Sequence, residues 1–281
     1  MRSPSDSTIL VTGATDGLGR GVAERLAELG ATLHIHGRDR ARLDATASAI
    51  TDATGNARIH THLADLASLE EVRALADDVE SSTEQLHGLI SNAGIGSGKP
   101  DLGTRQLSRD GYELRLAVNY LAGFLLTERL LPLLDRSAPA RIVNVASLGQ
   151  APIDFDDVML EHGYSGARAY AQSKLAQIMS GFELAERLAG TDVTVNSLHP
   201  ATYMPTKIVL DEIGRSVDTL DEGVEATVRL AVDPDLAGVT GRFFDRQRES
   251  RASDQAYDPD ARRRLWELSL DLVGESDRRS G

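Results

Sequence analysis

A tyrosine and a lysine four positions apart are the first residues in this sequence that could do chemistry. Tyr170 and Lys174 lie in a stretch with helical spacing, so both side chains are expected on one face of a helix. A phenol ordinarily titrates at about pH 10, and a neighbouring ammonium group lowers that pKa by stabilising the phenolate. Such a pair could move a proton near neutral pH, although the spacing alone also fits two exposed helix residues.

Two polar residues upstream favour the catalytic interpretation. Ser147 follows the apolar run Ile142 to Val145, and Asn119 lies inside the long helical stretch before that run. In a parallel sheet the ligand crevice lies beyond the carboxyl ends of the strands. We therefore expect Ser147 at the crevice, where its hydroxyl dipole could stabilise a developing alkoxide.

A glycine-rich loop near the N-terminus could bind a pyrophosphate. Gly13, Gly17 and Gly19 connect the apolar run Ile9 to Val11 to the first helical stretch. Glycines allow a sharp turn and a close approach to the ligand, and the helix N-terminus offers free N–H groups to phosphate. Between a first strand and a first helix, this cluster indicates a dinucleotide site. The other loop residues expected to contact the cofactor are Thr15, Asp16 and Leu18.

The end of the second apolar run indicates which dinucleotide binds. A preference for NAD normally requires an acidic residue there, but Gly37 stands at that place and Arg38 follows. A guanidinium can bind the 2′-phosphate of NADP with two parallel hydrogen bonds. Asp39 could reach a ribose or cap the next helix. We favour NADP as the cofactor, with NADPH preferred over NADH.

The elements that would position these residues alternate along the chain. Short apolar runs at 9–11, 32–36, 59–63, 86–90, 142–145 and 193–198 alternate with helical stretches at 19–29, 40–50, 68–81, 112–134 and 168–188. Such alternation predicts a parallel sheet covered on both faces and joined by right-handed crossovers. The expected fold class is α/β, a doubly wound parallel sheet of the Rossmann type.

The chain is expected to form one domain over residues 1–281, since no repeat or linker-like change of composition divides it. We place the core at about 8–245, a small substrate lid at about 201–221 and a C-terminal helix at about 259–273. Asp258 and Pro259 provide a cap and a first-turn proline for that helix. Trp266 is expected in the core or in an interface.

Charge and cysteine content exclude several other classes of protein. The 281 residues include 43 acidic and 30 basic side chains, a net charge of −13. A nucleic-acid-binding protein would need a basic stripe instead. The sequence has no cysteine, which rules out disulfides, thiolate metal sites and a cysteine nucleophile. This composition fits a reducing cytoplasm.

No segment of the sequence is predicted to cross a membrane. The best candidate, Leu116 to Leu134, contains Asn119, Glu128 and Arg129, whereas a span needs about 18 apolar residues with few or no charges. The polar start of the chain does not resemble a signal peptide. We therefore expect a cytoplasmic protein with no membrane partner.

Two other chemistries fit the sequence less well. Ser147 lacks the Gly-x-Ser-x-Gly setting of a hydrolase nucleophile. Two pairs of alternate histidines, on strands expected to be neighbours, could bind a metal, but polar packing near a sheet edge is the favoured interpretation. These histidines are His34, His36, His60 and His62. We expect no metal.

Taken together, the motifs resemble the short-chain dehydrogenase/reductase family over Thr8 to Leu272. The matching motifs are the Thr-Gly-x-x-x-Gly-x-Gly loop at 12–19, Asp65-Leu66, Asn92-Ala93-Gly94, Asn119, Ser147, Tyr170 and Lys174, in family order. The resemblance implies that Tyr170 is the general acid/base and that Ser147 hydrogen-bonds the same substrate oxygen. It implies that Lys174 binds the nicotinamide ribose and lowers the tyrosine pKa, while Asn119 holds a water of a proton relay.

The resemblance also assigns further cofactor contacts. Asp65 and Leu66 are expected near the adenine, although Asp65 fits an N-cap of the next helix equally well. Asn92, Ala93 and Gly94 are expected to support the nicotinamide half, which Tyr170 and Lys174 also contact.

The long separation of 23 positions between Ser147 and Tyr170 resembles the branch of retinol dehydrogenases and WW-domain oxidoreductases, as does the stretch 261–269. The chain departs from the family after the sixth run, where Ala201 replaces the expected glycine of a Pro-Gly pair and Thr202 and Thr206 flank the usual threonine position. Pro200 is still expected to contact the nicotinamide. The lid that follows could instead be a plain surface helix.

The resulting functional hypothesis is an NADP(H)-dependent oxidoreductase. It would transfer hydride between nicotinamide and a carbonyl or secondary alcohol, either bulky and lipophilic or a specialised-metabolite ketone. A dinucleotide-binding regulatory protein and an epimerase on the same fold are the alternatives. The stretches 112–134 and 168–188 resemble the helix pair through which many relatives dimerise, so a homodimer or homotetramer is one expectation.

Overall fold

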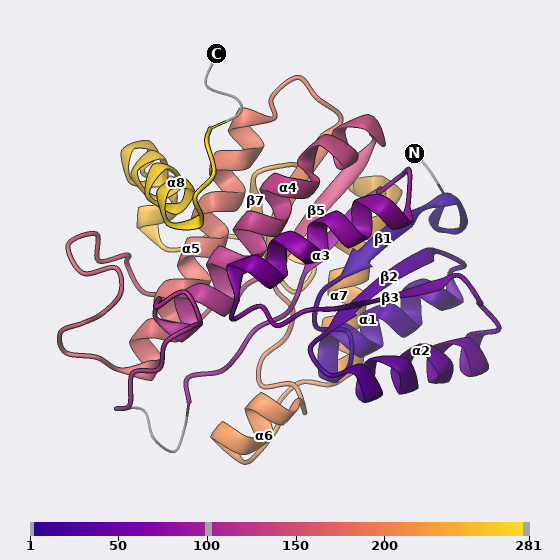
Figure 1. Cartoon of the computed structure of the whole chain (residues 1–281), viewed down its shortest axis with the longest axis horizontal. Coiled ribbons are helices and arrows are strands. Elements are labelled where there is room, and N and C mark those ends of the chain that lie inside the picture. The colour runs from indigo at the N-terminus through magenta and orange to yellow at the C-terminus, as the bar shows by residue number, and fades with distance from the viewer. Residues whose placement is uncertain (1–2, 99–102, 278–281) are drawn as a thin grey trace.

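The computed structural model describes residues 3–98 and 103–277, and within them one eight-stranded sheet runs through the molecule (Figure 1). The strand order is β3-β2-β1-β4-β5-β6-β7-β8, parallel as far as β7, with β8 antiparallel at the edge. The strands are β1 (Thr8–Val11), β2 (Thr32–Gly37), β3 (Ile59–Leu63), β4 (Gly88–Ser91), β5 (Ala140–Val145), β6 (Val193–His199), β7 (Arg242–Asp245) and β8 (Arg248–Ser250). The predicted doubly wound sheet is confirmed.

The order of the strands reverses between β1 and β4, so a crevice opens beyond their carboxyl ends. The glycine-rich loop leaves β1 at this point, and Asn92 follows β4 directly. Two motifs about 80 positions apart in the chain therefore meet at the position where dinucleotides bind in folds of this class.

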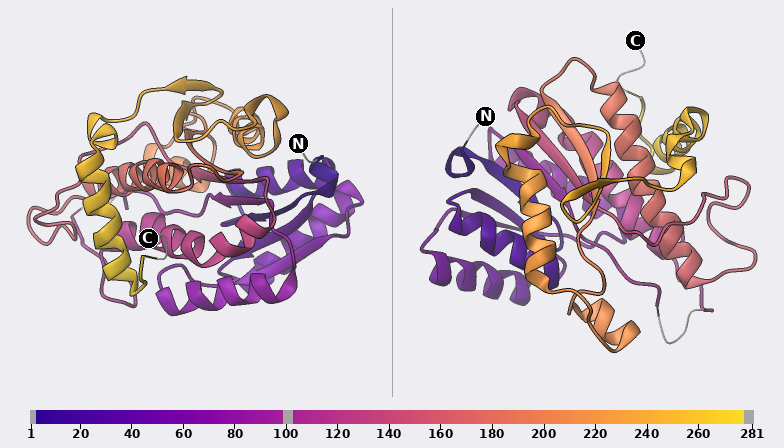
Figure 2. Two further views of the ribbon diagram at one scale, coloured as in Figure 1. Left: turned by 90° about the horizontal axis from the view of Figure 1, so that it is seen from above. Right: turned by 180° about the vertical axis from the view of Figure 1, so that it is seen from behind.

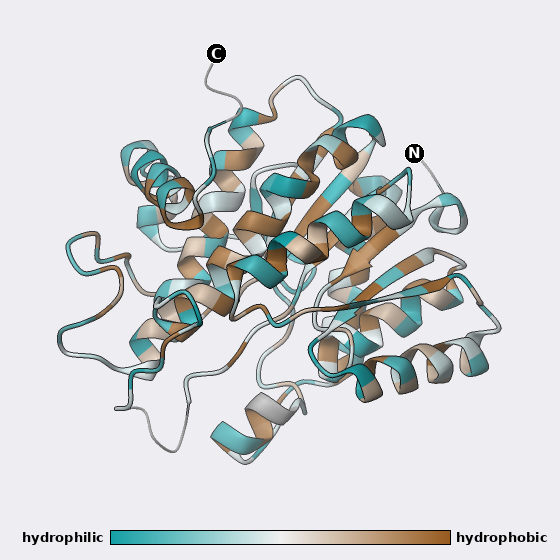
Figure 3. Cartoon of the chain, in the orientation of Figure 1, coloured by the Kyte–Doolittle hydropathy of each residue, from teal (hydrophilic) through white to brown (hydrophobic). Residues whose placement is uncertain are grey.

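Helices cover both faces of the sheet (Figure 2). One face packs against α1 (Gly17–Glu28), α2 (Arg40–Thr54) and α7 (Leu220–Val232). The other face packs against α3 (Leu69–Ser82), α4 (Ala122–Arg136), α5 (Gly166–Arg187) and, farther out, α8 (Pro259–Val273). Figure 3 shows the apolar strands in the centre and the polar helix surfaces outside, as burial of two hydrophobic faces requires.

The helix expected over 112–134 begins later and is not uniform. Leu116–Leu121 is π-helical and continues into α4, while Glu113 lies outside the helix in a β-bridge with Leu107. Leu116–Arg136 is long and apolar enough to cross a membrane, but 78% of its most apolar window is buried inside the protein. Packing against α3, α5 and the sheet accounts for its apolar character.

The C-terminal helix α8 forms as predicted, with Asp258 capping it and Pro259 in its first turn. It lies across the outer side of α4 and α5 (Figure 2). Trp266 is buried there and meets Phe124 edge-on, with ring centroids 4.9 Å apart. The hydroxyl groups of Tyr120 and Ser269 are hydrogen-bonded at 2.6 Å. The chain thus covers its own central helix pair.

Candidate active site

The glycine-rich loop is shaped by contacts that only glycine permits. Gly13 has a φ of +67°, and a Cβ there would lie 2.9 Å from the Cα of Ala93. A Cβ on Gly19 would lie 2.3 Å from the carbonyl oxygen of Gly13. The loop therefore packs directly against the segment after β4 and against the first turn of α1. This arrangement fits a pyrophosphate at the N-terminus of α1.

Thr12 connects the ends of β1 and β4. It belongs to the glycine-rich motif, but the sequence did not predict this role for it. Its Oγ1 accepts hydrogen bonds from the main-chain N–H groups of Asn92 and Ala93, both at 3.0 Å. The Asn92 side chain donates in return to the Thr12 carbonyl at 2.8 Å. These bonds fix the Asn92-Ala93-Gly94 motif beside the glycine-rich loop.

His36 on β2 binds the same loop through its imidazole ring. Its Nδ1 accepts from the Gly13 N–H at 3.2 Å, and its Nε2 lies 3.0 Å from the Ala64 carbonyl. Burial lowers the pKa of His36 to about 4, so the ring stays neutral and can accept at Nδ1. His34 and His62 form a separate contact at 2.8 Å, and His62 also bonds Asp78 at 2.6 Å, as polar packing implies.

Two guanidinium groups lie at the end of β2 and the start of α2, where the adenosine half of a dinucleotide is expected. Arg38 follows β2 and is exposed, while Arg42 lies four positions later on the first turn of α2. Arg42 pairs with Asp16 of the glycine-rich loop at 2.9 Å. Asp39 accepts from the Arg42 N–H at 3.0 Å, so the helix-cap interpretation of Asp39 is confirmed. Arg42 was missed in the sequence, although its spacing from Arg38 on a helix start was visible.

The expectation that Asp65 could cap the next helix is wrong. Ser68 caps α3 by accepting from the Glu71 N–H. Asp65 instead accepts from the Ala67 N–H at 3.0 Å in a tight turn, because α3 begins only at Leu69. Leu66 is buried in the core, and its expected contact with the adenine stays a prediction.

Ser147, Tyr170 and Lys174 gather at the carboxyl end of β5. The Lys174 Nζ lies 5.8 Å from the centre of the Tyr170 ring. It donates to the Val145 carbonyl at 3.0 Å and to Gln177 Oε1 at 2.9 Å. A Cβ added to Gly94 would lie 3.6 Å from the same Nζ, so the segment after β4 closes the site on its other side.

The electrostatics of this group differ from the expectation. Burial raises the pKa of Tyr170 above its ordinary value, and the Ser147 hydroxyl opposes this only in part. Burial also lowers the pKa of Lys174 to about 8, which weakens it as a source of positive charge. The predicted lowering of the tyrosine pKa is therefore not produced by the residues of the chain alone.

Asn119 joins three segments of the site. Its Oδ1 accepts from the Ile95 N–H at 2.7 Å, and its Nδ2 donates to the Ile95 carbonyl at 3.1 Å and to the Ser173 hydroxyl at 3.0 Å. The side chain thus holds the segment after β4 against α5. Its expected role in holding a water stays a prediction.

The predicted lid region contains a short helix, α6 (Lys207–Ile213), that projects from the body at the lower edge of Figure 1. Pro200 and Ala201, at the start of this region, are buried. Thr206 caps α6 and lies over the glycine-rich loop, since a Cβ on Gly17 would come within 3.1 Å of its methyl group. The predicted lid region therefore passes over the glycine-rich loop at Thr206.

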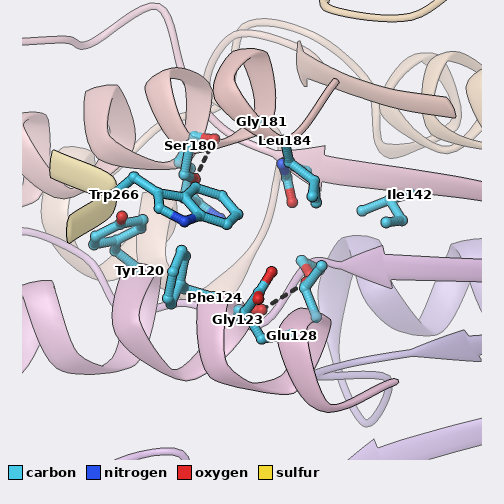
Figure 4. A pocket seen from close by; sticks show the side chains of 13 residues that line it. Tyr120, Gly123, Phe124, Glu128, Ile142, Ser180, Gly181, Leu184 and Trp266 are labelled. Carbon is cyan, nitrogen blue, oxygen red and sulfur yellow. Dashed lines mark hydrogen bonds between the residues drawn. The ribbon is translucent and has the colours of Figure 1, made fainter. Parts of the chain in front are cut away.

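Exposed apolar side chains are concentrated near this region. Four of them belong to the predicted lid and to the loop that carries Ser147, namely Leu148, Tyr203, Leu210 and Val217; Leu63, Leu107 and Tyr257 lie elsewhere. A small cavity elsewhere, between α4, α5 and α8, is lined by Tyr120, Phe124, Glu128 and Trp266 (Figure 4). It is a core cavity and contains none of the four predicted catalytic residues.

Comparisons with known proteins agree with this geometry. A sequence model of short chain dehydrogenases matches residues 7–212. Retinol dehydrogenase 14 of Homo sapiens is 37% identical, over 95% of this chain and 86% of that protein. A crystal structure of an uncharacterised Mycobacterium paratuberculosis protein gives a TM-score of 0.79 at 29% identity, over 98% of this chain and 96% of its own. The crystal structure of a Shigella flexneri short chain dehydrogenase complexed with NADP gives a TM-score of 0.69 at 28% identity. The match covers 86% of this chain and 97% of that one.

Proposed function

The chain belongs to the short-chain dehydrogenase/reductase family, in its retinol-dehydrogenase-like branch, and from this premise we propose an NADP(H)-dependent oxidoreductase. Its substrate would be an uncharged, lipophilic carbonyl compound or the corresponding secondary alcohol. The single observation that carries the proposal is the convergence of Ser147, Tyr170 and Lys174 at the end of β5, facing Gly94.

The chain's own residues can perform the proton part of this reaction. Tyr170 donates its phenolic proton to the carbonyl oxygen during reduction, and Ser147 donates a hydrogen bond to the same oxygen as charge develops on it. Lys174 keeps its ammonium beside the phenol through its bonds to Val145 and Gln177. NADPH, when bound, supplies the hydride.

The crevice fits NADP by its charge and shape. The glycine-rich loop presents the N-terminus of α1, and we assign the guanidinium groups of Arg38 and Arg42 to a 2′-phosphate. The complex of the Shigella flexneri relative with NADP supports this choice of cofactor.

The lipophilic substrate is inferred from the surroundings of the site. Leu148 lies next to Ser147, and Tyr203 and Leu210 are exposed on the lid. Such apolar side chains favour a substrate that buries hydrocarbon surface. The name of the human relative, a retinol dehydrogenase, points to the same class.

The proposal is tested with a panel of aldehydes, ketones and alcohols of increasing apolar length, each with NADPH or NADP and with NADH or NAD. We expect the highest kcat/KM for long apolar compounds with the phosphorylated cofactor. Tyr170→Phe should reduce turnover at least about 100-fold, while NADPH binding measured by fluorescence is retained. Full activity of Tyr170→Phe, or no turnover of any compound by the native chain, would refute the proposed function.

A further inference from the structure

A carboxylate on the lid bonds to the loop on the opposite side of the site. Glu212 lies near the end of α6. One of its carboxylate oxygens accepts from the Ser97 hydroxyl at 2.7 Å, and the other accepts from the Gly98 main-chain N–H at 2.8 Å. Both donors belong to the segment after β4 that begins with Asn92-Ala93-Gly94. The lid is therefore fastened across the expected position of the nicotinamide half of the cofactor.

The partner segment is a fixed anchor. Asn119 holds both main-chain groups of Ile95, and Arg115 donates from its Nε to the Gly96 carbonyl at 3.1 Å. Arg115 is itself buried and bonded to the Tyr164 hydroxyl at 2.9 Å. These bonds fix Ile95 and Gly96, the residues directly before the two donors, so the lid is the freer side of the contact with Glu212.

The base of the lid is also fixed. The main-chain N–H of Asp218 donates to the Thr202 carbonyl at 3.0 Å, and the Asp218 carboxylate accepts from the Thr202 N–H at 2.6 Å and from Arg246. The two ends of the stretch 203–217 are thus held together by the hydrogen bonds between Thr202 and Asp218. The bonds of Glu212 hold its outer part in the closed position.

The position of Glu212 also has an electrostatic effect on the site. Its negative charge adds to burial in raising the pKa of Tyr170, while the Ser147 hydroxyl lowers it. The cationic group beside the phenol is Lys174 on the same helix. The closed lid therefore brings a carboxylate close enough to the reacting phenol to affect it.

We propose that Glu212 is a positioning and specificity-determining residue, which latches the lid over the substrate and excludes substrates that carry a carboxylate or phosphate near the carbonyl. The inference rests on the proposed function and narrows it to uncharged substrates. A like charge in a partly desolvated site repels an anionic substrate more strongly than the same charge in water does.

The latch is tested without any substrate, by hydrogen exchange of the peptide amides in 203–217 of the full chain. Glu212→Ala removes both acceptors and should raise exchange in this stretch about tenfold. Ser97→Ala removes one donor and should give a smaller rise. Glu212→Gln keeps an oxygen and a nitrogen for the two partners and should leave most of the protection. Asp211→Asn, an adjacent exposed lid carboxylate, is the matched control and should change nothing. Equal exchange in Glu212→Ala and the native chain would overturn the latch.

The charge is tested with Glu212→Gln, which keeps the lid closed but neutral. Because a nearby negative charge opposes formation of phenolate, its removal should lower the pKa of Tyr170. The acidic limb of alcohol oxidation should then move to lower pH, and kcat/KM for a carboxylate-bearing carbonyl should rise about tenfold relative to its neutral analogue. Asp211→Asn should produce neither change, and an unaltered pH profile and selectivity in Glu212→Gln would refute the specificity role.

Failure of the proposed function can be told apart from failure of this inference. A chain without turnover of any carbonyl or alcohol can still be titrated by ultraviolet difference spectroscopy, with Tyr170→Phe identifying the signal of Tyr170. A lower tyrosine pKa in Glu212→Gln, together with faster exchange in Glu212→Ala, would then support the latch and its charge while the reaction is reassigned.

Discussion

Lys174 is an ammonium group held almost entirely away from water, and this has a consequence for stability. Burial lowers its pKa from 10.5 to about 8, so between these values the unfolded chain binds more protons than the folded one. Stability must therefore rise with pH across this window. Lys174 therefore destabilises the native chain most below about pH 8, where its buried side chain is charged.

We expect Lys174→Met to lose this pH dependence. The free energy of unfolding of the native chain, minus that of the variant, should increase by about 2–3 kcal/mol between about pH 7 and pH 10. Urea denaturation at a series of pH values measures this difference, in which most other titrating groups cancel. Parallel curves for the two proteins would show that the lysine is not desolvated as the structure indicates.

Arg38 and Arg42 should decide the choice between the two dinucleotides. Either substitution to alanine should raise KM for NADPH about tenfold or more, because a charge-assisted hydrogen bond to phosphate contributes about 1.5–3 kcal/mol. KM for NADH should change little. Arg40→Ala is the control, since Arg40 is exposed on the same turn and faces Asp44 at 3.7 Å. A preference for NADPH that survives the loss of both Arg38 and Arg42 would contradict the assignment.

At the residue scale, the sequence predicted the site residues that belong to short motifs. It missed the residues whose roles depend on contacts with distant parts of the chain. Tyr170, Lys174 and Ser147 could be found because spacing and strand ends place them together. Asp39 as a cap was readable from its position before a helix. Glu212 could not be found in this way, because its partner Ser97 lies 115 positions away. Arg42 was overlooked although its spacing from Arg38 was visible, and its contact with Asp16 is 26 positions distant. The cap of α3 was misplaced because Asp65 and Ser68 are both good capping residues close to the same helix start.

At the scale of elements, the six strands β1 to β6 were predicted and the last two, β7 and β8, were not. β7 contains only two apolar residues, Phe243 and Phe244, and β8 has three residues that are exposed on much of their length, so neither forms an apolar run in the sequence. The helix before β5 was predicted from its apolar spacing, but its π-helical start around Asn119 was not. That irregular segment depends on contacts with α5 and the loop after β4, which local sequence does not encode.

The insert between β5 and α5 is held by a buried network that involves Tyr164. Its hydroxyl donates to Glu113 Oε1 at 3.1 Å and accepts from Arg115 Nη1 at 2.9 Å, and both of these charged residues are buried. Tyr164→Phe leaves the two side chains without this partner and should destabilise the chain by about 1–3 kcal/mol. Thermal denaturation measures the loss, and Tyr203→Phe, at an exposed position, serves as the control. Equal midpoints for the two variants would show that the network adds no stability.

At the scale of the whole molecule, the net charge of −13 must be reconciled with an anionic cofactor. Local groups can resolve this conflict, because the N-terminus of α1 follows the glycine-rich loop and the proposed phosphate ligands Arg38 and Arg42 lie beside it, Arg42 being paired with Asp16 of that loop. Their fields act at short range, while the distant acidic side chains are screened within about 8 Å at physiological salt. The global charge therefore bears on solubility rather than on cofactor affinity.

The central helix pair leaves little apolar surface for a partner subunit. Fifteen of the 22 residues of α5 are buried within one chain, and α8 packs on α5 and, through Trp266, on Phe124 of α4. In the described part of the chain, none of the large exposed apolar side chains lies on α4, α5 or α8. Dimerisation through the stretches 112–134 and 168–188, expected from the family resemblance, would require α8 to move first.

We therefore expect a monomer in solution, measured by light scattering between about 1 and 100 μM. Trp266→Ala should loosen α8, because the indole packs on Phe124 and stacks under Arg187 at 4.7 Å. Loss of a buried tryptophan costs about 3–5 kcal/mol, and the uncovered faces of α4 and α5 should then associate as concentration rises. Glu267→Ala, on the same helix, is the control and should stay monomeric. A native dimer that persists on dilution, and that Trp266→Ala does not alter, would mean that copies associate through a different surface.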